Sequence, residues 1–137
     1  MIRVGIDLVE ICRIAKSMEN PRFLTRVFGP SERELFCTPR GVGPRGAERA
    51  AANFAAKEAF GKALGTGVRG FALAEVETLR DDQGAPYLKL GGRAAEIARQ
   101  RGLRFAVSLT HTKEYAQAIV IACNETETEA KGGMEGC

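Results

Sequence analysis

The chain has 137 residues, a length that suits one folded domain. Its composition, 45% hydrophobic and 27% charged, is that of an ordinary globular protein, and no apolar stretch is long enough to cross a membrane. A net charge of +3 is too small to indicate nucleic-acid binding, although it suits an anionic ligand or an acidic partner. The four cysteines form no C-x-x-C pair, which argues against structural zinc. The N-terminus has no signal-peptide pattern, so we expect a cytoplasmic protein without membrane contact.

The chain opens with a strand pattern. In residues 2–8 (IRVGIDL), apolar side chains alternate with arginine, glycine and aspartate. This period of two predicts a half-buried strand, with Asp7 on the face opposite the apolar side chains.

Helical patterns fill the rest of the first half. They cover residues 11–19, 23–28, a short helix beginning near position 31, and 47–64. Ser31 and Glu34 have the spacing of a capping box, and the Gly- and Pro-rich residues 38–46 predict a loop. The alanine-rich helix over residues 47–64 is the strongest helix prediction, and Gly65 supplies its end.

Strand patterns dominate the second half. They cover residues 71–80, 87–90, 103–109 and 115–123. A turn at residues 81–84 joins the first two as a hairpin, and residues 93–101 suit a short amphipathic helix. The polar residues 124–137 have no apolar face, so we expect a disordered tail after a single domain over residues 1–123. The fold class predicted is α+β.

Residues 54–62 (FAAKEAFGK) are the most informative segment. On a helix, Ala56 and Ala59 share one apolar side with Phe60. Glu58 and Lys62 lie one turn apart on the other side. One interpretation is a solvent-exposed ion pair worth about 0.2–0.5 kcal/mol. Gly61 costs roughly 1 kcal/mol inside a helix, which favours the alternative that something approaches the backbone here.

Asp7 adds a second carboxylate. It could be an exposed strand residue or a helix cap, but Mg²⁺ takes only one or two protein carboxylates and completes its shell with water and substrate phosphates. Asp7 and Glu58, with Lys57 and Lys62 nearby, would therefore suffice to bind Mg²⁺ and a pyrophosphate. His111, the single histidine, is either a surface turn residue or a phosphate contact.

Two motifs carry a family resemblance. Residues 5–11 (GIDLVEI) match G-x-D-[IL]-x-E-[IL], and residues 54–62 match F-[AS]-x-K-E-[AS]-x-x-K, with Gly-Thr-Gly at 65–67. Residues 84–86 (GAP) and 108–111 (SLTH) match further segments. On these motifs, residues 2–123 resemble the holo-[acyl-carrier-protein] synthases of the 4′-phosphopantetheinyl transferase superfamily. The resemblance implies that superfamily's fold, an antiparallel sheet with a long central helix.

The resemblance also implies an activity: Mg²⁺-dependent transfer of 4′-phosphopantetheine from coenzyme A to a serine of an apo acyl carrier protein, with release of 3′,5′-ADP. Asp7 and Glu58 would bind the metal, and Lys62 would stabilise charge on the phosphates. Either Glu58 or a metal-bound water would accept the serine proton. The implied coenzyme A contacts are Lys57, Lys62, Gly65, Thr66, Arg49, Asn53 and His111. Asn53 stands where the family usually has an arginine, which Arg49 could replace.

The same resemblance implies a homotrimer with active sites at subunit interfaces. The acidic carrier protein would dock on the basic residues of the first helices, namely Arg13, Lys16, Arg22 and Arg26. Whether that carrier serves fatty-acid or polyketide synthesis stays open. From the residues alone, a non-catalytic binding module and a Mg²⁺-dependent nucleotide hydrolase are alternatives, although the chain has no P-loop motif of an ordinary ATPase.

Overall fold

The computed structural model describes residues 1–124. Asn124, with which we expected the tail to begin, is the last residue of a strand, and the rest of the predicted tail (125–137) lies outside the described residues. Within residues 1–124, no helix is both long and apolar enough to cross a membrane.

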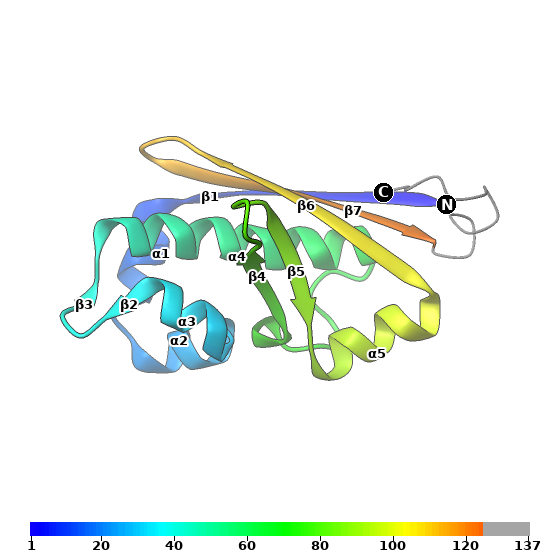
Figure 1. Cartoon of the computed structure of the whole chain (residues 1–137), viewed down its shortest axis with the longest axis horizontal. Helices are drawn as coiled ribbons and strands as arrows, with labels where there is room; N and C mark the ends of the chain where they lie inside the picture. The colour runs from blue at the N-terminus through cyan, green and yellow to red at the C-terminus, as the bar shows by residue number, and fades with distance from the viewer. Residues whose placement is uncertain (125–137) are drawn as a thin grey trace.

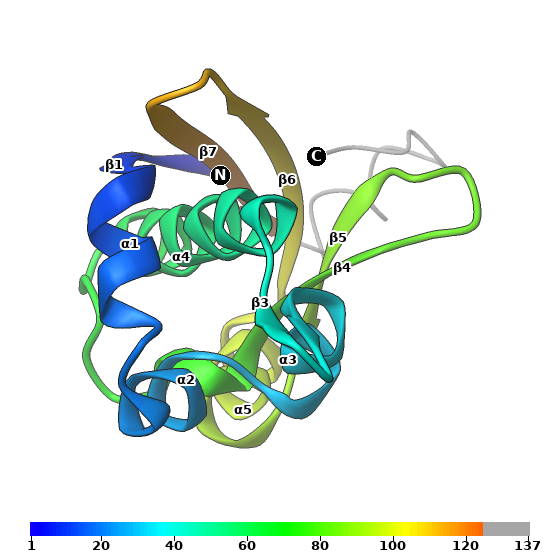
Figure 2. The same cartoon turned by 90° about the vertical axis from the view of Figure 1, so that its left-hand side faces the viewer.

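A three-stranded antiparallel sheet lies along one side of a long helix (Figure 1). The sheet has the order β1-β7-β6 and is built from β1 (Ile2–Glu10), β7 (Tyr115–Asn124) and β6 (Leu103–His111). The long helix, α4 (Pro44–Leu64), packs against one face of this sheet, and the smaller elements surround its other sides (Figure 2). The α+β fold class predicted from the sequence is confirmed.

The smaller elements supply short helices and two hairpins. They are α1 (Ile11–Ser17), α2 (Pro21–Val27), α3 (Pro30–Phe36), β2 (Cys37–Thr38), β3 (Gly41–Val42), the 3₁₀ turn η1 (Leu73–Glu75), β4 (Val76–Arg80), β5 (Pro86–Leu90) and α5 (Gly92–Arg101). The helices α4 and α5 end at glycines in the left-handed region, Gly65 and Gly102.

Three predicted boundaries were wrong. The strand expected from position 71 begins only at Val76, after η1. The first turn of α4 takes up the end of the predicted loop, because Pro44 has a backbone suited to the first helical position. The helix α3 begins at Pro30, with Gly29 rather than Ser31 as its N-cap. The backbone N–H of Gly29 donates to Glu32 Oε1 at 3.0 Å, in place of the expected Ser31–Glu34 box.

The small side chains of α4 let the sheet approach closely. Seven alanines of this helix are buried: Ala50, Ala51, Ala52, Ala55, Ala56, Ala59 and Ala63. The backbones approach closely at Gly5 of β1, where a Cβ would stand 1.9 Å from the carbonyl oxygen of Ala59. Glycine is therefore required at this point of β1.

The alternation predicted for β1 is confirmed, but its apolar side chains lie on the exposed face. They are Ile2 (73% exposed), Val4 (58%), Ile6 (52%) and Leu8 (59%). Pairing with β7 sets the half-buried Ile119 beside Ile6 and Ile121 beside Val4. We call these six residues the outer sheet face, and no element of the described chain covers it (Figure 1).

Candidate active site

Asp7 and Lys62 meet where β1 passes α4. Lys62 Nζ donates to Asp7 Oδ1 at 3.1 Å and to the carbonyl oxygen of Ile6 at 2.9 Å. Asp7 projects toward α4 because it lies on the same face of β1 as Gly5. Lys62 therefore links α4 to β1, whereas one interpretation of the sequence was an exposed pair with Glu58.

Glu58 lies one turn before Lys62 and is half-buried. Burial raises the pKa of its carboxyl, the nearby charge of Asp7 raises this pKa further, and Lys62 offsets part of the effect. A divalent cation bound beside Glu58 and Asp7 would relieve the repulsion that Glu58 experiences from Asp7.

The donor set fits Mg²⁺. Within residues 1–124, no group of three or more His, Cys, Asp and Glu side chains gathers in one place. The pair of Asp7 and Glu58 would leave most positions of a Mg²⁺ shell to water and phosphate oxygens, as this ion prefers.

Gly61 is close to another part of the backbone, as its sequence position indicated. A Cβ at Gly61 would stand 2.7 Å from the backbone of Gly67, and the Gly67 N–H donates to the Gly61 carbonyl at 3.0 Å. The approaching group is therefore the chain itself. The turn at residues 65–67 folds back onto α4 beside Lys62, with Gly65 at φ +84° and Gly67 at φ +67°.

Lys57 points away from this site into the interior. It is 0% exposed, and its Nζ donates to Glu32 Oε1 at 2.5 Å, to the Val76 carbonyl at 2.6 Å and to the Leu73 carbonyl at 3.0 Å. An ammonium group has three donors, and all three are used here. We therefore do not retain Lys57 as a coenzyme A contact.

Asn53 belongs to the same interior cluster. Its Nδ2 donates to Glu32 Oε2 at 2.9 Å and to the Thr78 carbonyl at 3.0 Å, which uses both amide protons. Glu77 Oε2 accepts from the backbone N–H groups of Ser31 and Glu32 at the start of α3. We call Glu32, Asn53, Lys57 and Glu77 the buried network. Sequence reasoning missed it because its members are far apart in the chain.

Burial shifts both ionisable groups of the central pair toward their neutral forms. It raises the pKa of Glu32 and lowers the pKa of Lys57, while the attraction between the two opposes both shifts. Two further N–H donors to Glu32, from Gly29 and Thr78, also favour its ionised form.

Arg49 and His111 lie on the other flank of α4. His111 ends β6, the sheet edge opposite β1, and its Nε2 is 3.6 Å from Glu48 Oε2. With Arg45, Arg49 and Arg80 it lines a cavity of about 290 Å³. The strands β6 and β1 form opposite edges of the sheet (Figure 2), so within one chain His111 on β6 is not brought together with Asp7 on β1. Arg49 lies nine residues before Glu58 on α4, which places it about half a turn around the helix from Glu58.

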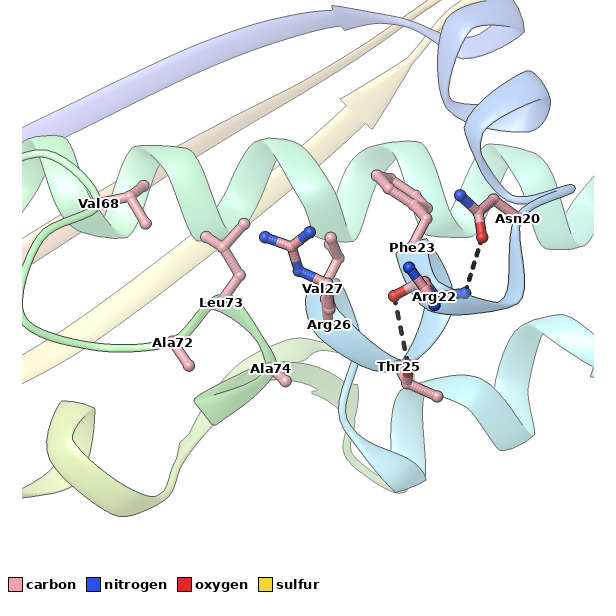
Figure 3. Close-up of a pocket in the computed structure, with 10 residues that line it drawn as sticks. All are labelled: Asn20, Arg22, Phe23, Thr25, Arg26, Val27, Val68, Ala72, Leu73 and Ala74. Atoms are coloured by element: carbon pink, nitrogen blue, oxygen red, sulfur yellow. Dashed lines mark hydrogen bonds between the residues drawn. The ribbon is translucent and has the colours of Figure 1, made fainter.

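The four basic residues predicted to bind the carrier are all exposed. Arg13 and Lys16 project from α1, and Arg22 and Arg26 project from α2. We call them the docking patch. Arg22 and Arg26 border a cavity of about 890 Å³ between α2 and residues 68–74, with apolar side chains such as Leu73 in its lining (Figure 3).

Comparisons with known proteins agree with this architecture. The family model described as 4′-phosphopantetheinyl transferase superfamily matches residues 3–120. The holo-[acyl-carrier-protein] synthase of Lachnoclostridium phytofermentans is 40% identical over 119 residues, 86% of this chain and 92% of that protein. The one from Trichlorobacter lovleyi is 43% identical over 125 residues, 88% of this chain and 96% of that protein.

Solved structures give the same result. The holo-[acyl-carrier-protein] synthase of Neisseria meningitidis matches with a TM-score of 0.80 at 30% identity, over 90% of this chain and 100% of that chain. The Bacillus anthracis enzyme in complex with coenzyme A (3′,5′-ADP) matches with a TM-score of 0.74 at 32% identity, over 89% and 96% of the two chains.

Fold and sequence thus define an enzyme of the phosphopantetheinyl transferase class. The chain belongs to the 4′-phosphopantetheinyl transferase superfamily, among its holo-[acyl-carrier-protein] synthases.

The buried network generates a prediction about stability. Glu32→Gln should lower the free energy of unfolding by about 3–5 kcal/mol, because Lys57 would be left buried without its counter-charge. Urea denaturation at neutral pH measures this loss. Glu96→Gln, an exposed position on α5, is the matched control and should change stability by less than about 0.5 kcal/mol. A loss below about 1 kcal/mol for Glu32→Gln would show that the pair is not held as ions.

Proposed function

We propose that the chain transfers the 4′-phosphopantetheine arm of coenzyme A to a serine of an apo acyl carrier protein where β1 meets α4, with Asp7 and Glu58 as the ligands of Mg²⁺. The observation that carries this assignment is the meeting of Asp7, Glu58 and Lys62 from two distant segments. Solved relatives in complex with coenzyme A support the choice of donor.

The reaction forms a bond between the serine oxygen and the β-phosphorus of coenzyme A and breaks the bond from that phosphorus to the bridging oxygen. The leaving group is 3′,5′-ADP. Asp7 and Glu58 would hold Mg²⁺, and the ion would neutralise negative charge on the pyrophosphate. The Lys62 ammonium, held at the site by Asp7 and the Ile6 carbonyl, stabilises charge that builds on the leaving phosphate.

Glu58 is our choice for the base. Glu58 lies one turn before Lys62 on the same flank of α4, so its carboxylate is close to the phosphate that Lys62 would contact. The serine proton would move to a Glu58 oxygen as the serine oxygen attacks.

One assay tests the function. The chain is incubated with coenzyme A, Mg²⁺ and an apo carrier protein, and the carrier is then weighed by mass spectrometry. We expect a gain equal to 4′-phosphopantetheine. A binding module would hold its ligand without any gain, and a nucleotide hydrolase would release products without modifying the carrier. No gain across several apo carriers would contradict the proposal.

Asp7→Asn and Glu58→Gln should each lower kcat by about 100-fold or more, because each removes a charged ligand of the metal. Steady-state kinetics at moderate Mg²⁺ gives this value, and circular dichroism verifies that the variants fold. A variant that keeps more than about a tenth of the rate would remove that residue from the metal site.

The pKa of Glu58 gives a readout that does not depend on activity. Since its folded-state pKa lies above the ordinary value, its contribution to stability is present at low pH and lost as pH rises through the folded-state pKa. In EDTA at pH 7, Glu58→Gln should therefore be at least as stable as the wild type. Mg²⁺ at 100 times its Kd should stabilise only the wild type, by about 2.7 kcal/mol in thermal unfolding.

We also propose a homotrimer with active sites at its subunit interfaces. The six apolar side chains of the outer sheet face support association, since a contiguous exposed apolar patch usually marks a contact surface. The separation of Arg49 and His111 from Asp7 within one chain supports it as well. In an assembly, Arg49 and His111 of one copy could lie beside Asp7 and Glu58 of the next copy and complete its active site.

Light scattering tests the assembly. The wild type should have three times the 14.8 kDa mass of one chain. Val4→Glu should lower this mass and the activity together, because it places a charge in the apolar contact. Tyr87→Glu, an exposed aromatic of β5 outside the outer sheet face, is the control and should stay assembled. A monomeric wild type at assay concentration would rule the trimer out.

The docking patch is our candidate surface for the acidic carrier. Reversing Arg13 and Arg22 to Glu should raise KM for the carrier by about tenfold at low salt and flatten its salt dependence, because such charges act mainly on encounter. KM for coenzyme A should remain unchanged in this variant. Lys89→Glu, an exposed lysine on β5, is the control. A higher KM for coenzyme A with an unchanged carrier KM would place this patch at the phosphates instead.

A further inference from the structure

Arg3 reaches the C-terminal end of α4 from the site face of β1. It lies two residues from Gly5, on the same face as Asp7 but in the other direction along the strand. Its Nη1 is 2.5 Å from the position that a Cβ of Gly65 would occupy. The guanidinium therefore lies directly beside the Gly65 backbone, in the space that a Cβ at this position would occupy.

No group in residues 1–124 forms a hydrogen bond or ion pair with this guanidinium. Two other cations stand nearby: Lys62 precedes Gly65 by one turn, and Arg101 Nη1 donates to the Leu64 carbonyl at 3.1 Å. Asp7 is the carboxylate bound to Lys62. Cations gathered in this way repel one another until an anion binds between them.

The adjoining turn offers a backbone donor. Gly65 and Gly67 use their N–H groups within the turn, whereas no carbonyl of the described chain accepts from the N–H of Thr66. Thr66 is exposed and directly follows the residue on which Arg3 lies. An oxyanion at this point would meet a guanidinium fork and a backbone N–H together.

Attraction of a cation to the negative end of a helix is the competing explanation. It accounts well for Arg101, which donates to a carbonyl of the last turn. It accounts less well for Arg3, which donates to none of these carbonyls.

We propose that Arg3 binds a phosphate group in the nucleotide half of coenzyme A, together with the backbone of Thr66. This inference rests on the proposed function. Seven residues of helix separate Glu58 from Gly65, a rise of about 10 Å, so Arg3 is too far along α4 to act on the reacting phosphorus. Its role is therefore binding, and a guanidinium suits a phosphate because two N–H groups can donate side by side.

Calorimetry on the full chain with 3′,5′-ADP and Mg²⁺ tests the proposal without any turnover. Arg3→Met should raise Kd by about tenfold, the effect of losing one charge-assisted contact. Arg3→Lys should raise it less, because the charge remains and the fork is lost. Arg99→Met is the matched control, since it removes an exposed cation from the last turn of α5 and should leave Kd unchanged.

Two further ligands identify the phosphate. If Arg3→Met weakens coenzyme A but not dephospho-coenzyme A, the contact is the 3′-phosphate; if it weakens both, the contact is the diphosphate. Either result supports the proposal. A Kd within twofold of the wild type for Arg3→Met and Arg3→Lys alike would overturn it and leave Arg3 as a helix-end residue. If the wild type binds no 3′,5′-ADP, the proposed function is contradicted, and the role proposed for Arg3, which rests on it, is contradicted as well.

Discussion

The backbone contact between Gly5 of β1 and Ala59 of α4 determines where the proposed site residues lie. Because neither residue extends beyond a methyl group, the strand lies directly on the helix. Asp7 and Arg3, two residues to either side of Gly5, then reach Lys62 and Gly65. A larger side chain at position 5 would push β1 away and separate the carboxylate of the strand from the lysine of the helix.

Neighbouring residues of α4 have opposite surroundings. Lys57 is held inside by one carboxylate and two carbonyls, while Glu58, rotated by about 100° around the axis, is half-buried on the flank toward β1. A buried ion pair adds little net stability over an apolar pair. The pair of Glu32 and Lys57 does restrict rotation of α4 about its axis, because the Lys57 ammonium reaches its three acceptors in only one orientation of the helix. The buried network thus fixes the direction in which Glu58 points.

Local patterns predicted much of this fold. The long helix, its glycine end, the hairpin of β4 and β5 and the alternation of β1 all depend on neighbours in sequence, and all were found. The covered face of β1 was not predictable, since alternation shows only that two faces differ. Here the face with Gly5 packs on α4. The alanine side chains of α4 are short, so this helix makes close contact only with a strand face that also has small side chains.

The candidate site, like the fold, was predicted in part from the sequence. Motif positions indicated Asp7, Glu58 and Lys62, which the fold brings together. Lys57 and Lys62 look alike in sequence, and only the distant Glu32 distinguishes them by giving Lys57 a buried partner. Gly61 correctly indicated a close approach, but a glycine cannot reveal whether a ligand or the chain's own turn makes it.

The strand β1 would connect the proposed assembly with the proposed active site. One of its faces carries Asp7 and Arg3, and the other carries the exposed apolar residues of the outer sheet face. Within residues 1–124, β1 is an edge strand that pairs with β7 alone, so in this part of the chain its position depends on β7 and α4. Covering its apolar face would remove the cost of exposing large side chains, about 1.5–3 kcal/mol for each fully buried one, and would restrict the strand that positions Asp7. Association through this face would therefore restrict the position of Asp7, and with it the metal site that we propose, even where the partner contributes no residue to that site.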